Sequence, residues 1–370
     1  MIYLDYQATT PLAPEVRAAM LPWLDKFGNP HSPHRAGREA AAAVAVAQSQ
    51  VAITLGDDRS DGRLIFTSGA TEAANWALQA SVIQSERRKI VTIATEHACV
   101  LDTARWLERQ QIDLVVLPVG TDGLVDLDRA KSAIDDRTAV VAAMLVNNEI
   151  GVIQPIQALA DLAHAAGALL FCDAVQGFGR IPLPLDHCDL VAISSHKIYG
   201  PKGIGALWLR PGLDWPPLLH GGGQQDGLRS GTLSPMLCAG FGAAAQLAGR
   251  LREEDHNHIN LLADLAEKAF ETWTLNGGRS HRYRGNLNLR RAGIDANRLI
   301  SDVRDVAFSA GSACASGSGR PSHVLQALGL DDKAARASIR LGFGRYTTVQ
   351  DIETASALIN DAAAAQLEWA

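Results

Sequence analysis

The stretch 189–203 reads Asp-Leu-Val-Ala-Ile-Ser-Ser-His-Lys-Ile-Tyr-Gly-Pro-Lys-Gly and joins an apolar run to a cluster of polar side chains. The apolar run is typical of a buried strand, and Lys197 follows where that strand ends. A lysine in this place can form a Schiff base with a bound aldehyde cofactor, while the adjacent hydroxyl and imidazole can donate to a phosphate. A solvated lysine opening a Gly-Pro turn is the alternative. The rest of the chain has to decide between the two.

Short apolar runs of the same kind alternate with alanine-rich helical stretches between about residues 15 and 250. Near-continuous apolar strands separated by helices are typical of a mostly parallel sheet covered on both faces. We therefore predict an α/β fold with a mostly parallel, seven-stranded sheet. Its predicted strands are 63–67, 89–94, 114–118, 139–146, 169–172, 190–194 and 205–209.

The sequence changes in character after about residue 250. A charged helix is expected at 251–273, followed by polar segments, a loop around Cys314 and a last helix near 349–369. We predict a large domain over 15–250. A smaller α+β domain, formed by 1–14 and 251–370, is expected to carry the Cys314 loop.

Composition limits the function classes. The net charge of −6 leaves no basic surplus to neutralise phosphates, so nucleic-acid binding is not expected. The longest apolar run, 139–146, is too short to span a bilayer. The first residues lack the basic start and apolar run of a signal peptide, so we predict a cytoplasmic protein.

The five cysteines form no CxxC pair and no metal-ligand spacing, so we predict free thiols and no metal site. Cys172 and Cys238 stand in apolar surroundings and are expected in the core. Cys314 differs because glycines and serines surround it. We expect it on an exposed, mobile segment.

Polar groups suited to a phosphate follow two of the predicted strands. In open parallel sheets, ligands bind beyond the carboxyl ends of the strands. After 63–67 comes a glycine turn with Ala70 and Thr71, opening a helix at 73–79, and a helix N-terminus binds anions. Ser194 and His196 follow a second strand. A plain N-cap at Thr71 is the alternative reading.

Further polar groups follow the other strands and suit an aromatic ring. His97 could lie flat on such a ring and shuttle protons, or be a structural histidine. Asp173 at a buried strand end needs a partner, and a protonated pyridine nitrogen is one. Gln176 could hydrogen-bond a phenolic oxygen. With the Lys197 amine and the phosphate groups, these residues predict pyridoxal 5′-phosphate.

At these residues the chain resembles the cysteine desulfurases of the NifS/IscS type, within the class V aminotransferases of pyridoxal-phosphate fold type I. The resemblance spans nearly the whole chain in order. The matching segments are 3–11, 27–39, 68–72, 95–97, 147–151, 173–176, 195–203, 220–223, 229–232, 311–325 and 339–340. Ser195 stands where we expect a glycine before the His-Lys pair.

The resemblance implies roles for individual residues. Lys197 resembles the Schiff-base lysine and His97 the acid/base that stacks on the ring. Arg340, assisted by Asn148, corresponds to the clamp on the substrate carboxylate, which suits a bidentate guanidinium. Cys314 corresponds to the nucleophile. The expected cofactor contacts are Ala70, Thr71, His97, Asp173, Gln176, Ser194, His196, Lys197 and Thr232.

The resemblance also implies an activity and partners. The enzyme is expected to convert L-cysteine to L-alanine and to carry the sulfur as a persulfide on Cys314. It would pass that sulfur to an acceptor protein, such as an iron–sulfur scaffold, or toward other thio-cofactors. Thr232 matches a residue that reaches the phosphate of the neighbouring subunit, which implies a homodimer.

The sequence bears on three alternatives to this function. The run 220–223, His-Gly-Gly-Gly, resembles an esterase oxyanion loop, but no G-x-S-x-G elbow stands between a strand and a helix, so we exclude a hydrolase. A selenocysteine lyase or an aminotransferase of the same superfamily would share Lys197, Asp173 and His97. A non-catalytic sulfur-relay protein would be expected to lack one of the key residues, and none is missing.

Overall fold

The computed structural model describes residues 1–58, 61–310 and 321–368. Its larger part is built on a seven-stranded sheet of order β2-β8-β7-β6-β5-β3-β4, in which only β8 runs antiparallel to its neighbours. All seven predicted strands are confirmed, with small shifts at their ends. They are β2 (Arg63–Thr67), β3 (Lys89–Ile93), β4 (Asp113–Leu117), β5 (Thr138–Met144), β6 (Leu169–Asp173), β7 (Leu190–Ser194) and β8 (Gly205–Leu209).

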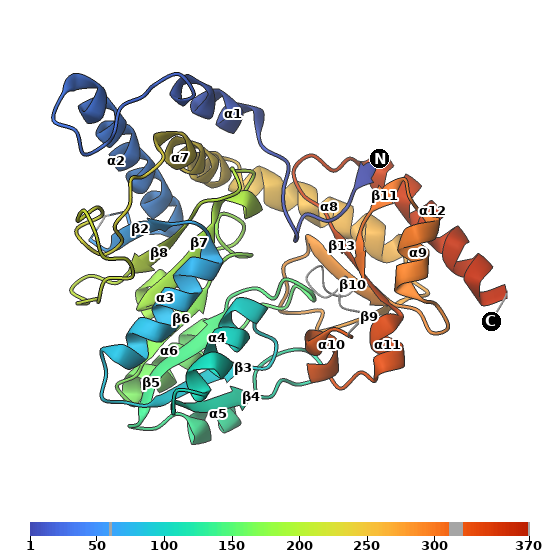
Figure 1. The fold of residues 1–370 in the computed structure, drawn as a ribbon. Coiled ribbons are helices and arrows are strands. Elements are labelled where there is room, and N and C mark those ends of the chain that lie inside the picture. Colours follow the sequence, from blue (N-terminus) through green and yellow to red (C-terminus); the bar gives the residue numbers. More distant parts are fainter. Residues whose placement is uncertain (59–60, 311–320, 369–370) are drawn as a thin grey trace.

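Helices cover both faces of this sheet (Figure 1). Successive side chains of a strand point to opposite faces, so in β7 Val191 and Ile193 enter one core while Leu190 and Ala192 enter the other. This two-sided burial explains why the strands are apolar at nearly every position. The helices of this part are α1 (Pro14–Met20), α2 (Arg35–Leu55), α3 (Ala70–Ile83), α4 (Ala98–Glu108), α5 (Leu127–Ala133), α6 (Ile156–Ala165) and α7 (Pro235–Arg250).

A second, smaller part holds a four-stranded antiparallel sheet of order β12-β13-β10-β9 and a two-stranded parallel sheet of β1 and β11. The predicted helix at 251–273 is observed as α8, and the last one as α12. The strands are β1 (Ile2–Tyr3), β9 (Thr274–Leu275), β10 (Asn286–Arg290), β11 (Val306–Ala307), β12 (Ser309–Ala310) and β13 (Ser338–Gly342). The helices are α8 (Arg252–Ala269), α9 (Ala296–Asp302), α10 (His323–Ala327), α11 (Asp332–Arg336) and α12 (Val349–Glu368).

The first residues of the chain lie in this smaller part, where β1 pairs with β11 (Figure 1). Ile2 and Tyr3 pair with Val306 and Ala307 in register. The division into a domain over 15–250 and one over 1–14 with 251–370 stays a prediction. Within the described residues, no helix is long and apolar enough to cross a membrane.

Candidate active site

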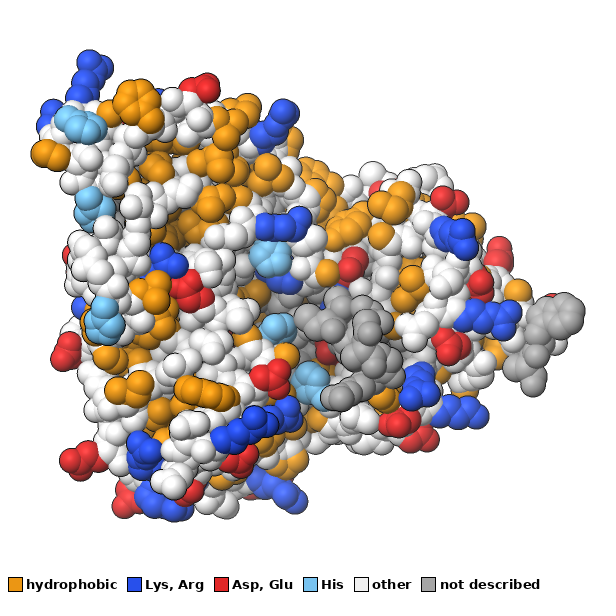
Figure 2. Space-filling model, in the orientation of Figure 1, with side chains coloured by type: hydrophobic (Ala, Val, Ile, Leu, Met, Phe, Trp, Pro, Cys, Tyr) orange, Lys and Arg blue, Asp and Glu red, His pale blue; other side chains and the backbone are white. Residues whose placement is uncertain are grey.

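A cavity of about 790 Å³ lies at the carboxyl ends of the parallel strands, where the smaller part meets the sheet. Figure 2 shows histidine side chains gathered near the centre of this face of the molecule. The lining residues come from the ends of β2, β5, β6 and β7 and from β13 of the smaller part. They include the predicted residues Ala70, Thr71, His97, Asn148, Asp173, Gln176, Ser194, His196, Lys197 and Arg340.

Lys197 ends a short 3-10 turn, η3 (Ser195–Lys197), directly after β7. Its Nζ donates hydrogen bonds to the backbone carbonyls of Gln7, at 2.5 Å, and of Ala8, at 2.7 Å. These carbonyls belong to the first segment of the chain. The amine is therefore aimed into the cavity from the sheet and held there by the N-terminal segment.

Asp173 ends β6 and is only 5% exposed. Its Oδ1 accepts a hydrogen bond from the backbone N–H of Val175 at 3.0 Å. Burial raises the pKa of this carboxyl, although the nearby His97 and Lys197 act in the opposite direction. A carboxylate in such a place gains from a cationic partner in the cavity, and a protonated ring nitrogen is of that kind.

Gln176 follows three residues later and is also buried. Its Nε2 donates to the carbonyl of Gln7 at 2.9 Å, and its Oε1 accepts from Nη1 of Arg180 at 2.6 Å. Since an amide nitrogen carries two hydrogens, one remains for a ligand oxygen.

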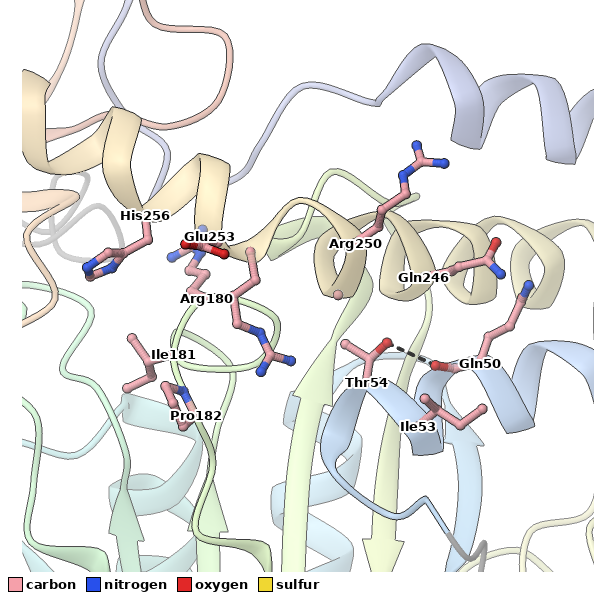
Figure 3. Close-up of a pocket in the computed structure, with 12 residues that line it drawn as sticks. Gln50, Ile53, Thr54, Arg180, Ile181, Pro182, Gln246, Arg250, Glu253 and His256 are labelled. Atoms are coloured by element: carbon pink, nitrogen blue, oxygen red, sulfur yellow. Dashed lines mark hydrogen bonds between the residues drawn. The ribbon is translucent and has the colours of Figure 1, made fainter.

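Arg180 supports the site from a separate cavity of about 690 Å³, between α2 and the junction of α7 with α8 (Figure 3). Its Nη2 donates to the carbonyl of Lys197 at 2.7 Å, and its Nη1 bonds Gln176 as described. None of the predicted site residues lines this second cavity. Arg180 therefore positions the backbone of Lys197 and the amide of Gln176 from outside the main cavity.

The start of α3 lies at the wall of the main cavity. Gly69 precedes the helix without a side-chain cap, so the first N–H groups have no partner within the helix. A Cβ at Gly205 of β8 would lie 2.8 Å from Cα of Gly69, so only glycine allows β8 to approach this turn. Thr71, Ser194 and Lys202 line the same space. A free helix N-terminus with such neighbours is suited to an anion.

His196 lies on this side too, with Nδ1 3.1 Å from Oγ1 of Thr9. Its pKa is lowered to about 4, first by burial and then by the cations Lys197, Lys202 and Arg180. The imidazole is therefore neutral at pH 7, and a neutral imidazole can meet an anion as a hydrogen-bond donor rather than as a charge.

Arg340 lies in β13 and is 1% exposed. Its Nη2 donates to Oδ1 of Asp5 at 2.6 Å, and its Nη1 donates to the carbonyl of Asn148 at 3.0 Å. Its Nε has no hydrogen-bond partner among the described residues. The ion pair with Asp5 was not predicted. It holds the guanidinium rigid at the cavity wall, where a carboxylate can be bound.

One predicted residue within the described part of the chain is not brought into this cavity. Thr232 is exposed and does not line it in the described chain. Cys314 lies outside the described residues. Pro321, the first described residue after it, does line the cavity.

Comparison with known proteins agrees with this geometry. The family model for aminotransferase class-V matches residues 2–354. The chain belongs to the class-V aminotransferase family. Within that family it is 46% identical, over 370 residues, to a protein of Rickettsia africae (strain ESF-5) named Cysteine desulfurase IscS. The match covers 97% of this chain and 90% of the relative.

Solved structures show the same relationship. One described as a NifS-like protein has a TM-score of 0.91 at 30% identity, covering 98% of this chain and 99% of the other. Another, SspA in complex with cysteine, has a TM-score of 0.83 at 32% identity, covering 94% and 100%. The resemblance to cysteine desulfurases is confirmed, and with it the fold type and the class of enzyme.

Pyridoxal 5′-phosphate is the cofactor of this class, and the cavity fits its chemistry. The uncapped start of α3, with Lys202 and the neutral His196, suits the phosphate. The buried Asp173 suits the ring nitrogen, and the amine of Lys197 suits the aldehyde.

Sequence reasoning missed several residues of this desulfurase cavity. They are Asp102, Lys202, His323, Cys99 and Glu149. Lys202 and Glu149 stand inside motifs that carried the resemblance, so their position was available as a signal. His323 also stands in such a motif, the segment 311–325, and it reaches the cavity from α10 of the smaller part.

Glu149 is a buried carboxyl at the wall of the cavity. Its Oε2 accepts a hydrogen bond from Oγ of Ser322 at 2.5 Å. Burial raises its pKa to about 7, against the opposing effects of Ser322 and Arg340. The folded protein therefore holds a proton here that the unfolded chain releases near pH 4.5.

A pH-dependent loss of stability should follow. A pKa raised in the folded state gives stability that is present below pH 4.5 and lost as the pH rises through about 7. Relative to the parent, Glu149→Gln should gain up to roughly 3 kcal/mol of unfolding free energy between pH 5 and 8. Denaturant titrations across this range measure the difference. The control is Glu254→Gln, which changes an exposed glutamate in α8. If the difference in unfolding free energy between Glu149→Gln and the parent does not change with pH, the raised pKa is contradicted.

Proposed function

We propose that this enzyme converts L-cysteine to L-alanine and transfers the sulfur through a persulfide on Cys314. One observation supports the proposal most. The amine of Lys197 and the buried carboxylate of Asp173 line a single cavity together with the uncapped start of α3. This is the set of groups that an aldehyde-, pyridine- and phosphate-bearing cofactor requires.

In this proposal, Lys197 binds the cofactor aldehyde, and Asp173 keeps the ring nitrogen protonated. Gln176 donates to the phenolic oxygen, and His97 lies against the ring. Bound pyridoxal phosphate supplies an electron sink for the electrons released at the substrate's α-carbon. The phosphate is held by Ala70, Thr71, Ser194 and His196, together with Thr232 of a second copy.

The protein's own groups handle the substrate and its protons. Arg340, with Asn148, binds the substrate carboxylate through its guanidinium. Lys197 and His97 are two bases that line the cavity, and His97 is kept mostly neutral because burial lowers its pKa. A neutral imidazole can accept a proton at pH 7.

Cys314 supplies the step that distinguishes a desulfurase. Its thiolate attacks the γ-sulfur of the bound cysteine, so that an S–S bond forms while the substrate's Cβ–Sγ bond breaks. The electron pair stays with the substrate, and a proton delivered to Cβ completes alanine. The outer sulfur is then transferred to an acceptor protein, for which an iron–sulfur scaffold is our candidate, in the cytoplasm.

We further propose a homodimer with the sites at its interface. Thr232 is exposed and lines no part of the cavity in its own described chain, which fits a role in the partner's site. Large apolar side chains are exposed on α2 and on the segment between α1 and α2, which lie at the top of this view (Figure 2). They are Leu21, Leu24, Phe27, Val46 and Ile53, and an interface would bury them.

A selenocysteine lyase is the second candidate, because it would share Lys197, Asp173 and His97. It differs in needing no thiol at position 314. The fate of alanine production in a Cys314 variant therefore separates the two.

Asp173 provides a direct test of the cofactor assignment. Without its carboxylate the ring nitrogen is not held protonated, so Asp173→Ala should lower alanine formation from cysteine by at least roughly a hundredfold. Alanine and sulfide are measured with saturating pyridoxal phosphate, and Asp186→Ala, an exposed aspartate in η2 (Leu185–His187), is the control. A decrease of less than about threefold, well under about 1 kcal/mol, would refute the role.

A further inference from the structure

Cys99 makes two contacts with one nitrogen of His97. It is the second residue of α4, and its backbone N–H donates to Nδ1 of His97 at 3.2 Å. Its Sγ lies 3.0 Å from the same Nδ1. Cys99 also lines the active-site cavity. It therefore adjoins the residue that we assign to proton transfer.

These contacts decide which nitrogen of His97 carries the proton. A backbone N–H can only donate, so Nδ1 must offer its lone pair. The neutral ring then holds its single proton on Nε2. A second proton would have to go onto Nδ1, where it would face the donating N–H of Cys99 and break the N-cap of α4. The thiol can donate to the same lone pair.

We propose that Cys99 is a positioning residue for His97, and that its thiol and backbone N–H together hold the imidazole as the tautomer protonated on Nε2. This inference rests on the proposed role of His97 in catalysis. Cys99 acts through the ring and touches no reacting atom in the proposal. The thiol is the part that mutation can remove, because the backbone N–H remains in every variant.

Other charges act on the same ring. Burial is the largest influence and lowers the pKa of His97, and Lys197 from η3 and His323 from α10 act in the same direction. Asp173 from β6 and Asp102 from α4 oppose them. Within the described chain, the backbone N–H and the thiol of Cys99 are the groups recorded at Nδ1. A hydrogen-bond donor to Nδ1 stabilises the neutral ring, so it lowers the pKa of His97 further, in the same direction as burial.

Removing the thiol should therefore raise the pKa of His97. In Cys99→Ala, the acidic limb of kcat/KM against pH should move up by about half to one unit, the equivalent of one ordinary hydrogen bond. Below the midpoint, kcat should fall several-fold while KM for cysteine is unchanged. Cys99→Ser keeps a donor and should return the limb toward its original position. Cys238→Ala, a buried thiol in α7, is the control.

A second readout does not depend on turnover. In protein labelled with ¹⁵N-histidine and free of cofactor, the resonances of His97 are assigned by their loss in His97→Gln. At pH 7 they should show an unprotonated Nδ1 and a protonated Nε2. A proton on Nδ1, or an unmoved acidic limb in Cys99→Ala, would overturn the proposal. If His97→Gln instead keeps normal turnover, the catalytic role of His97 fails, while the resonances still decide the tautomer.

Discussion

Lys197→Ala should abolish conversion of cysteine to alanine, with a decrease of at least roughly 10⁴-fold, as expected when a covalent catalyst is removed. The side chain is the amine that enters the cavity at the end of β7, and its Nζ is fixed by the carbonyls of Gln7 and Ala8. The variant should also lose the visible absorbance of lysine-bound pyridoxal phosphate. Because the phosphate contacts remain, some cofactor should still bind. Alanine release and the absorption spectrum measure both effects.

Lys197→Arg separates the amine from its charge. Arginine keeps the positive charge, but its guanidinium cannot replace the amine as nucleophile, so this variant should be as inactive as Lys197→Ala. Lys268→Ala, in the last turn of α8, is the control for a lysine outside the cavity. Normal turnover in Lys197→Ala would sink the assignment of the site.

The large sheet could be predicted because each strand is apolar on both faces. The strands 63–67, 190–194 and 205–209 are observed with unchanged bounds, since a polar residue or glycine follows or precedes each apolar run. The strand predicted at 139–146 ends at Met144 instead. The prediction extended too far because Leu145 and Val146, which follow the strand where the chain turns, are also apolar. Val146 then forms an isolated bridge with Ile153. Apolar composition alone does not show where a buried strand stops.

The smaller sheet could not be predicted in this way. β10 and β13 pair over a long separation in sequence, and β10 carries buried asparagines at positions 286 and 288. Asn286 and Asn288 bond carbonyls of Asn148 and Glu149. A polar residue that is satisfied by a distant carbonyl looks like a loop residue in the sequence.

The residues of the candidate site also fall into those that the sequence could predict and those that it could not. Lys197, Asp173 and His97 could be found because the carboxyl ends of parallel strands meet at one edge of the sheet. The Asp5–Arg340 ion pair and the contacts of Lys197 with Gln7 and Ala8 could not be found, since they join segments that lie far apart in the sequence. The periodicity of apolar residues predicts a single helix or strand, but it does not predict which distant segment that element will contact.

Cys314→Ser should nearly abolish sulfur transfer while leaving the cofactor site intact. A serine hydroxyl is a far weaker nucleophile than a thiolate at neutral pH, and it cannot hold sulfur as a persulfide. The variant should still bind pyridoxal phosphate and still change its visible spectrum on addition of cysteine, because Lys197 and Arg340 are untouched. Released sulfide should fall to background, and mass spectrometry should find no persulfide on the chain.

The same variant decides between the two candidate enzymes. In a desulfurase, loss of the Cys314 thiol stops alanine together with sulfur, since the Cβ–Sγ bond breaks only when an acceptor takes the sulfur. In a lyase that uses another acceptor, Cys314→Ser would make alanine at the parent's rate. Cys238→Ala controls for the loss of a thiol elsewhere and should keep both products. If Cys314→Ser forms alanine at the rate of the unmodified enzyme, the assignment as a desulfurase is wrong and the assignment as a lyase takes its place. The roles assigned to Lys197 and Asp173 would not change.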